Sequence, residues 1–309
     1  MTRVLQILNK PVLVLLLVVM STSCIKDNLN DCYVYPLTLN FHYTKNIQGE
    51  DLFTSKIDVV HLFVYENGEL VADYEVEQKN LIDGYKYQIP IKPGDYNIVA
   101  WGGVRKSYDY LAINSEDDAL MKIKSDLNGR VEELPEHNYH AKELHIKHSN
   151  LENQEYPMYF MKNTNDVRVI VKGIPQLTKN SENSLINCDI KAVNGVYKFD
   201  NKIYGNNRIH YIPEQWYEGA DSYSDFVVMR LWRGDDSHLV VSLNEEDDVF
   251  SIYNASLSAL LLLKPDTDLD LEDEFEIIFN LTGEVDDEGE LEVEITINDW
   301  TVVDQNEGM

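Results

Sequence analysis

The densest group of side chains that could bind a metal ion is the histidine-rich stretch at 136–148. His137 and His140 are close enough in sequence to share a metal, but a zinc site normally needs more than two protein ligands. The pair also lacks the glutamate and the spacing of the helical zinc-protease motif. If residues 139–146 form a strand, the two imidazoles point to opposite faces of the sheet. We therefore interpret this stretch as a solvated polar strand, and we predict no metal site and no cofactor.

The acidic side chains give no clearer sign of chemistry. Asp266, Asp268, Asp270 and Glu272 alternate as in a calcium-binding loop, but the glycine that lets an EF-hand loop turn is missing. We interpret this segment as an acidic loop that leads into a strand. With 54 Asp and Glu residues in the chain, no single pair of carboxylates identifies a catalytic site. Nucleophile-elbow, Walker and glycine-rich phosphate motifs are also missing, so we predict no catalytic residues and a protein that is not an enzyme.

Cys24 is the residue whose position predicts a covalent modification. It ends a segment with the order of a bacterial export signal: positive charge at Arg3 and Lys10, an apolar run at 12–20, and small residues at 21–23. The apolar run is about half the roughly 20 residues that a membrane-spanning helix needs. A cleaved signal is therefore favoured over a retained transmembrane anchor.

A cysteine at this place resembles the lipobox cysteine of bacterial lipoproteins, although Ser21 stands where leucine is usual. The resemblance implies that residues 1–23 are a signal peptide and that the sulfur of Cys24 carries lipid. Stable anchoring takes about two acyl chains, at about 0.8 kcal/mol for each buried methylene, so a triacylated cysteine would hold the protein at the membrane. Residues 25–27 resemble the short signals that send some lipoproteins to the outer face. We expect an outer-membrane lipoprotein that is exposed at the cell surface.

The formal net charge of −28 limits the partners of the chain. Nucleic-acid binding needs clustered Lys and Arg, so we predict no nucleic-acid partner. Anionic lipid headgroups would repel the protein, so the lipid on Cys24 must make the membrane contact.

The remaining cysteines and the tryptophans leave alternatives open. Cys32 and Cys188 could form a disulfide in an oxidising compartment, or stay as buried thiols, which is the interpretation that we prefer. The four tryptophans could stack on sugars, but packing in a core is the more common role of such side chains. They are Trp101, Trp216, Trp232 and Trp300.

The chain after the export signal has the pattern of β-strands. Apolar and polar residues alternate over 37–44, which predicts a half-buried strand, and 57–65 is a nearly continuous apolar run that suits a central strand. Asn67-Gly68 and Asn194-Gly195 each predict a tight hairpin, and 286–290 predicts a hairpin turn. Further strands are expected at 70–76, 85–91, 96–101, 139–146, 167–171, 188–193, 196–199, 226–232, 239–243, 275–281 and 291–298, with short helices within 107–129 and at 254–263, the latter capped by Asn254.

The spacing of these strands predicts the fold class. Strands about ten residues apart with turn residues between them are typical of a β-sandwich, and the long crossover helices that a parallel sheet requires are missing. We predict an all-β fold of two tandem β-sandwich domains with short helical insertions. The segment 149–156 is polar and has no periodicity, which places the boundary near 150–165. The N-terminal domain would comprise residues 24–155 and the C-terminal domain residues 156–309.

Several short segments of the chain carry a family resemblance. They are 23–27, 31–32, 37–41, 57–65 with Asn67-Gly68, 93–96, 99–102 and 295–300. Together they resemble the FimB-like fimbrillin family of Bacteroidales, the lipoprotein subunits that anchor fimbriae. The resemblance spans most of the chain after the export signal. It implies two transthyretin-like, Greek-key β-sandwich domains, a lipid-fixed N-terminus, assembly by strand exchange, and a fimbrial stalk or other fimbrillin subunits as partners.

The family resemblance also separates an anchor from a stalk subunit. Stalk subunits lose their lipid when a trypsin-like protease cuts after an arginine near the N-terminus, and no arginine lies between Cys24 and Arg105. We therefore expect a non-catalytic anchor or accessory subunit that keeps its lipid and joins its partners by β-strand addition. The alternatives are a surface glycan-binding β-sandwich lipoprotein and, third, a lipoprotein enzyme.

Overall fold

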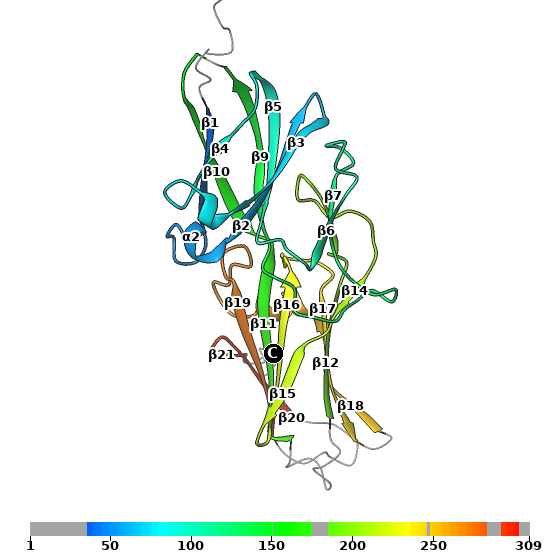
Figure 1. The fold of residues 1–309 in the computed structure, drawn as a ribbon. Helices are drawn as coiled ribbons and strands as arrows, with labels where there is room; N and C mark the ends of the chain where they lie inside the picture. Colours follow the sequence, from blue (N-terminus) through cyan, green and yellow to red (C-terminus); the bar gives the residue numbers. More distant parts are fainter. Residues whose placement is uncertain (1–35, 150, 175–184, 246–247, 283–291, 303–309) are drawn as a thin grey trace, which may run out of the picture. The chain divides into compact units, whose positions relative to one another are not determined.

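Nearly all regular structure in this protein is β-strand (Figure 1). The computed structural model describes residues 36–149, 151–174, 185–245, 248–282 and 292–302. Within these ranges the helical segments are α2 (Phe53–Lys56), η2 (Gln78–Asn80) and α3 (Leu257–Leu261). None of these helices is long and apolar enough to cross a membrane. The prediction of an all-β fold is confirmed.

The first sheet has seven strands in the order β3-β2-β5-β9-β10-β1-β4. Their bounds are β1 (Leu37–Lys45), β2 (Val59–Glu66), β3 (Glu69–Glu77), β4 (Lys86–Ile89), β5 (Gly94–Gly102), β9 (Tyr139–His148) and β10 (Gln154–Lys162). Neighbours are antiparallel except β1 and β10. The two edge strands approach each other, because Tyr74 of β3 and Tyr87 of β4 make a T-shaped contact with 5.9 Å between ring centroids. The sheet therefore curls around an apolar core of its own.

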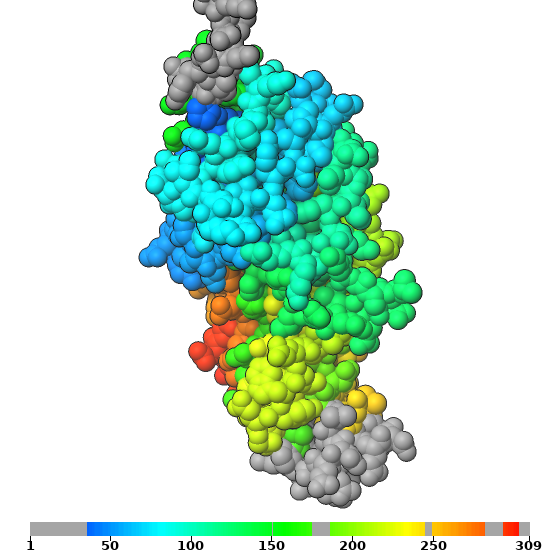
Figure 2. Space-filling model, viewed as in Figure 1, coloured from blue at the N-terminus to red at the C-terminus, as the bar shows by residue number. Residues whose placement is uncertain are grey.

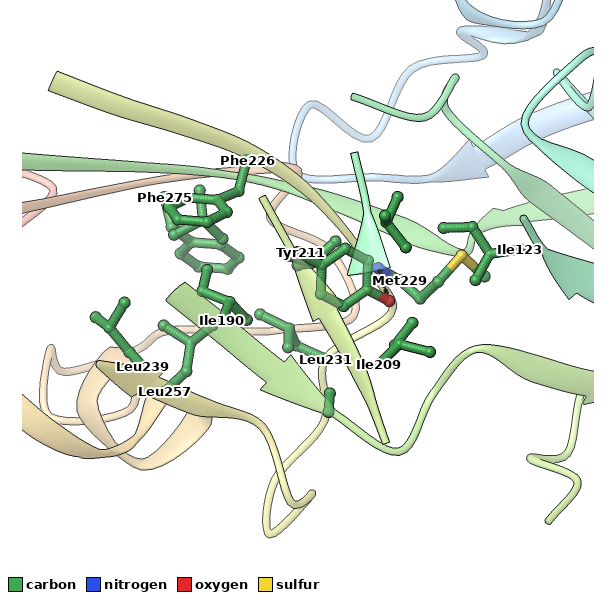
Figure 3. Packing of buried hydrophobic residues seen from close by; sticks show 14 of the residues in the cluster. Ile123, Ile190, Ile209, Tyr211, Phe226, Met229, Leu231, Leu239, Leu257 and Phe275 are labelled. Atoms are coloured by element: carbon green, nitrogen blue, oxygen red, sulfur yellow. Dashed lines mark hydrogen bonds between the residues drawn. The ribbon is translucent and has the colours of Figure 1, made fainter. Parts of the chain in front are cut away.

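Two further sheets form a sandwich. The six-stranded sheet has the order β15-β16-β11-β19-β20-β21, and the five-stranded sheet has the order β18-β17-β12-β14-β8. Their bounds are β8 (Arg130–Val131), β11 (Thr164–Lys172), β12 (Leu185–Ala192), β14 (Ile209–Tyr211), β15 (Glu214–Glu218), β16 (Asp221–Met229), β17 (His238–Glu245), β18 (Asp248–Ser256), β19 (Glu274–Thr282), β20 (Glu292–Ile297) and β21 (Trp300–Thr301). Alternate apolar residues of both sheets belong to one buried cluster, in which Phe226 and Phe275 lie near Ile190 and Leu239 (Figure 3). Burial of these alternate side chains holds the two sheets together.

The segment between β5 and β9 is extended, so the short helices expected within 107–129 are a wrong prediction. It contains β6 (Tyr108–Leu111) and β7 (Leu120–Ile123), which pair with each other, and β7 also pairs with β13 (Val196–Lys198). Met121 and Ile123 are buried while Lys122 between them is exposed. This two-residue period is too short to recognise in four-residue strands, and long-range pairing decides their conformation. In Figure 2 the segment, coloured teal to green, lies against the yellow-green part of the chain.

One of the two Asn-Gly hairpins forms as predicted. Asn67 and Gly68 both have positive φ, 53° and 82°, which is the conformation of a tight turn between β2 and β3. The hairpin predicted at Asn194-Gly195 is wrong, because β12 and β13 belong to different sheets. Asn194 is buried, donates to the carbonyl of Met229 and accepts from the hydroxyl of Tyr211. Here asparagine serves as a buried hydrogen-bonding bridge between strands.

The helix expected at 254–263 is shorter than predicted. It is α3, and its cap is Ser256, whose hydroxyl accepts from the backbone N–H of Ala259. Asn254, the expected cap, instead lies in β18.

The chain leaves the seven-stranded sheet at Lys162 and enters the six-stranded sheet at Thr164. The turn expected at 286–290 lies outside the described residues.

Candidate functional site: the first strand and the strand edges

Strand β1 is the first described element after the predicted lipid site, and it is a central strand. Cys24 itself lies outside the described residues. β1 pairs in parallel with β10 and antiparallel with β4. Leu37, Leu39, Phe41 and Tyr43 are each 0% exposed, which confirms the alternation predicted for 37–44. Burying such a side chain contributes roughly 1.5–3 kcal/mol, so β1 is firmly held in the sheet.

Asp51 fixes the end of β1. Its carboxylate accepts from the backbone N–H groups of Tyr43 (2.9 Å) and Phe53 (3.2 Å), and it lies 2.7 Å from Nδ1 of His42. Burial acts to raise the pKa of Asp51, but these hydrogen bonds to its charged form outweigh burial, so the pKa is lowered. The carboxylate therefore stays ionised and holds the turn that follows β1.

The acidic loop before β19 connects β1 to the sandwich. Its prediction as an acidic loop that leads into a strand is confirmed, and the contacts show what the acids do. The hydroxyl of Tyr43 donates to Asp273 (3.1 Å), and the N–H of Ile47 donates to the carbonyl of Leu271 (3.1 Å). Asp270 accepts from Arg230 at 2.7 Å. Asp273 and Asp270 therefore link this loop to β1 and to Arg230.

Lys162 is a buried cation beneath this loop. Its side chain is 3% exposed, and Nζ donates to the backbone carbonyl of Glu272, which also accepts from the side chain of Asn165. Burial lowers the pKa of Lys162 to about 8, although Asp273 and Asp270 act in the opposite direction. This residue carries no signal in the sequence, because a lone lysine at a strand end is usually exposed.

The histidine-rich stretch contains β9, as predicted, but it is not solvated throughout. His140 is 2% exposed, its Nε2 lies 2.9 Å from the carbonyl oxygen of Phe199, and burial lowers its pKa to about 4. His148 is also buried and contacts Gln154. His145 contacts Asn97 at 2.8 Å. In the described part of the chain, no three His, Cys, Asp or Glu side chains are grouped as a metal site.

The outward face of the six-stranded sheet carries a stacked pair of aromatic side chains. Trp216 of β15 stacks on Tyr223 of β16 with 5.3 Å between ring centroids and 9° between ring planes. The guanidinium of Arg168 lies 5.6 Å from the centroid of Trp216 and makes two 2.7 Å hydrogen bonds to Asp225. Beside this group is a cavity of about 590 Å³ lined in part by acidic side chains. Trp101, by contrast, is fully buried in the core.

Cys188 is a free thiol in the core of the sandwich. It is 4% exposed, and burial raises its pKa to about 12. Cys32 lies outside the described residues. A buried thiol with a raised pKa is unreactive at neutral pH, so Cys188 has a packing role.

Comparisons with known proteins match this fold. Residues 29–306 match the family model of fimbrillin-A associated anchor proteins Mfa1 and Mfa2. The solved fimbrial anchor protein Mfa2 from Porphyromonas gingivalis is 19% identical, with a TM-score of 0.69 over 87% of this chain and 98% of that chain. A candidate polysaccharide-binding protein from Bacteroides thetaiotaomicron is 22% identical, with a TM-score of 0.75 over 89% and 100%. A candidate adhesin from the same species is 24% identical, with a TM-score of 0.69 over 86% and 96%. No curated protein matches the sequence.

The solved structures share the all-β fold, and the family model defines the class as an envelope-associated fimbrial protein with a structural role. Because the family model covers most of the sequence, the chain belongs to the family of fimbrillin-A associated anchor proteins Mfa1 and Mfa2.

Proposed function

We propose that this protein is a non-catalytic fimbrial anchor or accessory subunit. It is fixed to the outer membrane by lipid on Cys24, is exposed at the cell surface, and joins the fimbrial stalk or other fimbrillin subunits by β-strand addition. The observation that supports this proposal best is the place of β1. The first described strand after Cys24, β1, lies between β10 and β4, so main-chain hydrogen bonds to both neighbours would resist a pull on the lipid.

The sequence before β2 supports retention of the tether. A trypsin-like cut after an arginine near the N-terminus would separate the protein from its lipid, but no arginine lies between Cys24 and Arg105. The division into two transthyretin-like domains, 24–155 and 156–309, is part of the proposal. The change of sheet between Lys162 and Thr164 supports two units, and because β10 (Gln154–Lys162) belongs to the first sheet, it favours a boundary at residue 163 rather than 155. Pairing of β7 with β13 and of β8 with β14 would then join the two domains.

The anchor role is tested by substitution of the lipid site in the living cell. With Cys24→Ala we expect no incorporation of an alkyne-labelled fatty acid and loss of fimbriae into the medium, because the protein loses its membrane attachment. Cys32→Ser is the matched control and should keep both the label and the attached fimbriae. Fimbriae that stay attached and normal in length in Cys24→Ala cells, or in cells without the gene, would contradict the proposal.

Glycan binding is the second candidate function. It is supported by Trp216, which stands on the outward face of the six-stranded sheet beside the cavity, and by the polysaccharide-binding description of one solved relative. We rank it below the anchor role because Trp216 stacks on Tyr223, so part of the ring surface that a sugar would use is occupied. Binding of the purified protein to a glycan array that is abolished by Trp216→Ala would reverse this order.

A further inference from the structure

Strand β18 has a free edge that differs from every other sheet edge in the described part of the chain. It is nine residues long, and after Asp248 its residues 249–256 include no charged residue, proline or glycine. No described strand pairs with its outer side. Figure 1 shows β18 at the end of the five-stranded sheet, beyond β17 and β12.

The other described edges carry the usual protection against strand pairing. Proteins keep edge strands short or charged because unpaired N–H and C=O groups attract another strand. β4, β6, β8, β13, β15 and β21 have five residues or fewer. β3 is also nine residues long, but it contains Glu69, Asp73, Glu75 and Glu77. Among the long described edges, β18 alone lacks charged residues after its first position, and a bulge at Ile252 is the only irregularity in its described pairing with β17.

The apolar side chains at this edge are only partly covered. Phe250, Ile252 and Tyr253 of β18 pack against the sandwich core but are half-buried. Tyr253 lies over Phe279 of β19, with 5.5 Å between ring centroids. β20 pairs with β19 in the opposite sheet. The inward side chains of β20, Val293 and Ile295, are also half-buried.

We propose that the free edge of β18 is the acceptor for an extended segment of a neighbouring fimbrial subunit. Main-chain bonds to β18 would extend the five-stranded sheet, and alternate apolar side chains of the added strand would cover Phe250, Ile252 and the inward residues of β20. Its outward side chains are neutral or basic, because the acceptor carries a formal net charge of −28. The same charge disfavours a second copy of this chain as the occupant. This inference rests on the proposed function and locates its subunit contact.

The test uses the full-length protein in its own cells after deletion of the chromosomal gene. Val249 is 70% exposed and Ser251 is exposed, so Val249→Lys and Ser251→Lys place a charge on the edge without disturbing the core. Val71→Lys on the acidic edge strand β3, where Val71 is 49% exposed, is the matched control. We expect severalfold less fimbrial subunit to co-purify from solubilised outer membranes with the two β18 variants, and no loss with the control.

A photo-crosslinking benzoylphenylalanine at position 249 tests the contact directly, without relying on a decrease in co-purified subunit. It should give a cross-link to a fimbrial subunit identified by mass spectrometry, whereas the same group at position 71 should give none. Cross-links only between copies of this chain, or β18 variants that retain the subunit like wild type, would overturn the proposal. Fimbriae that remain attached in the deletion strain would refute the anchor role itself. Detachment in that strain, with normal retention by both β18 variants, would refute only the β18 contact.

Discussion

Lys162 shows how a single buried charge sets the pH response of the junction between the first sheet and the acidic loop. Its folded-state pKa of about 8 lies below the ordinary value of 10.5, so the folded protein binds its proton less tightly than the unfolded chain does. The unfavourable contribution to stability is complete below pH 8, and it disappears as the pH rises to the unfolded pKa.

We therefore expect Lys162→Met to raise the free energy of unfolding at pH 7, by about 1–3 kcal/mol. The carbonyl of Glu272 would still accept from Asn165. The difference between variant and wild type should shrink between pH 8 and pH 10, which urea unfolding at each pH measures. Taking this difference cancels the effect of the buried tyrosines, which titrate in both proteins. A difference that stays constant over this range would show that Lys162 is charged in the folded state.

At the scale of elements, substitutions in β1 test whether this strand stabilises the first sheet. Leu39 is 0% exposed and faces the core inside the curled sheet, whereas its neighbour Asn40 faces outward. We expect Leu39→Ala to lower the free energy of unfolding by about 2–5 kcal/mol, because it leaves a cavity in the core. Asn40→Ala is the control and should cost less than about 1 kcal/mol. Urea unfolding followed by tyrosine fluorescence measures both, and equal losses would contradict the assigned orientation of β1.

Some of these strands could be predicted from the sequence and others could not. β1 and β2 are predictable from the segments 37–44 and 57–65, because β1 buries its alternate apolar residues and β2 buries residues on both of its faces. β6 and β7 are not, since they are four residues each and their conformation depends on β13 far along the chain. Asn194-Gly195 has hairpin chemistry but is used in another way, because Asn194 finds partners in β14 and β16.

The sequence predicts only part of the candidate site, for a related reason. The proposed lipid site Cys24 is predicted from local order alone, because an export signal is recognised before the chain folds. The exposed edge of β18 depends on which strand lies last in its sheet, and that is a property of topology. The one available signal was the run 249–256, which has no charge in a chain rich in acids.

The whole molecule carries a formal net charge of −28, and this excess should make its stability depend on salt. Like charges repel more strongly in the compact state, and the screening length falls from about 30 Å at 0.01 M salt to about 10 Å at 0.1 M. Exposed ion pairs such as that of Arg168 and Asp225 weaken in salt, but each contributes only up to about 1 kcal/mol. We expect the midpoint of thermal unfolding to rise by several degrees between these concentrations.

The exposed acids Glu69 and Asp73 on β3 provide the control. The double substitution Glu69→Gln and Asp73→Asn should raise the midpoint at low salt and make it less dependent on salt. A midpoint that is constant or falls with added sodium chloride would mean that local ion pairs, rather than net repulsion, dominate the electrostatics of this fold.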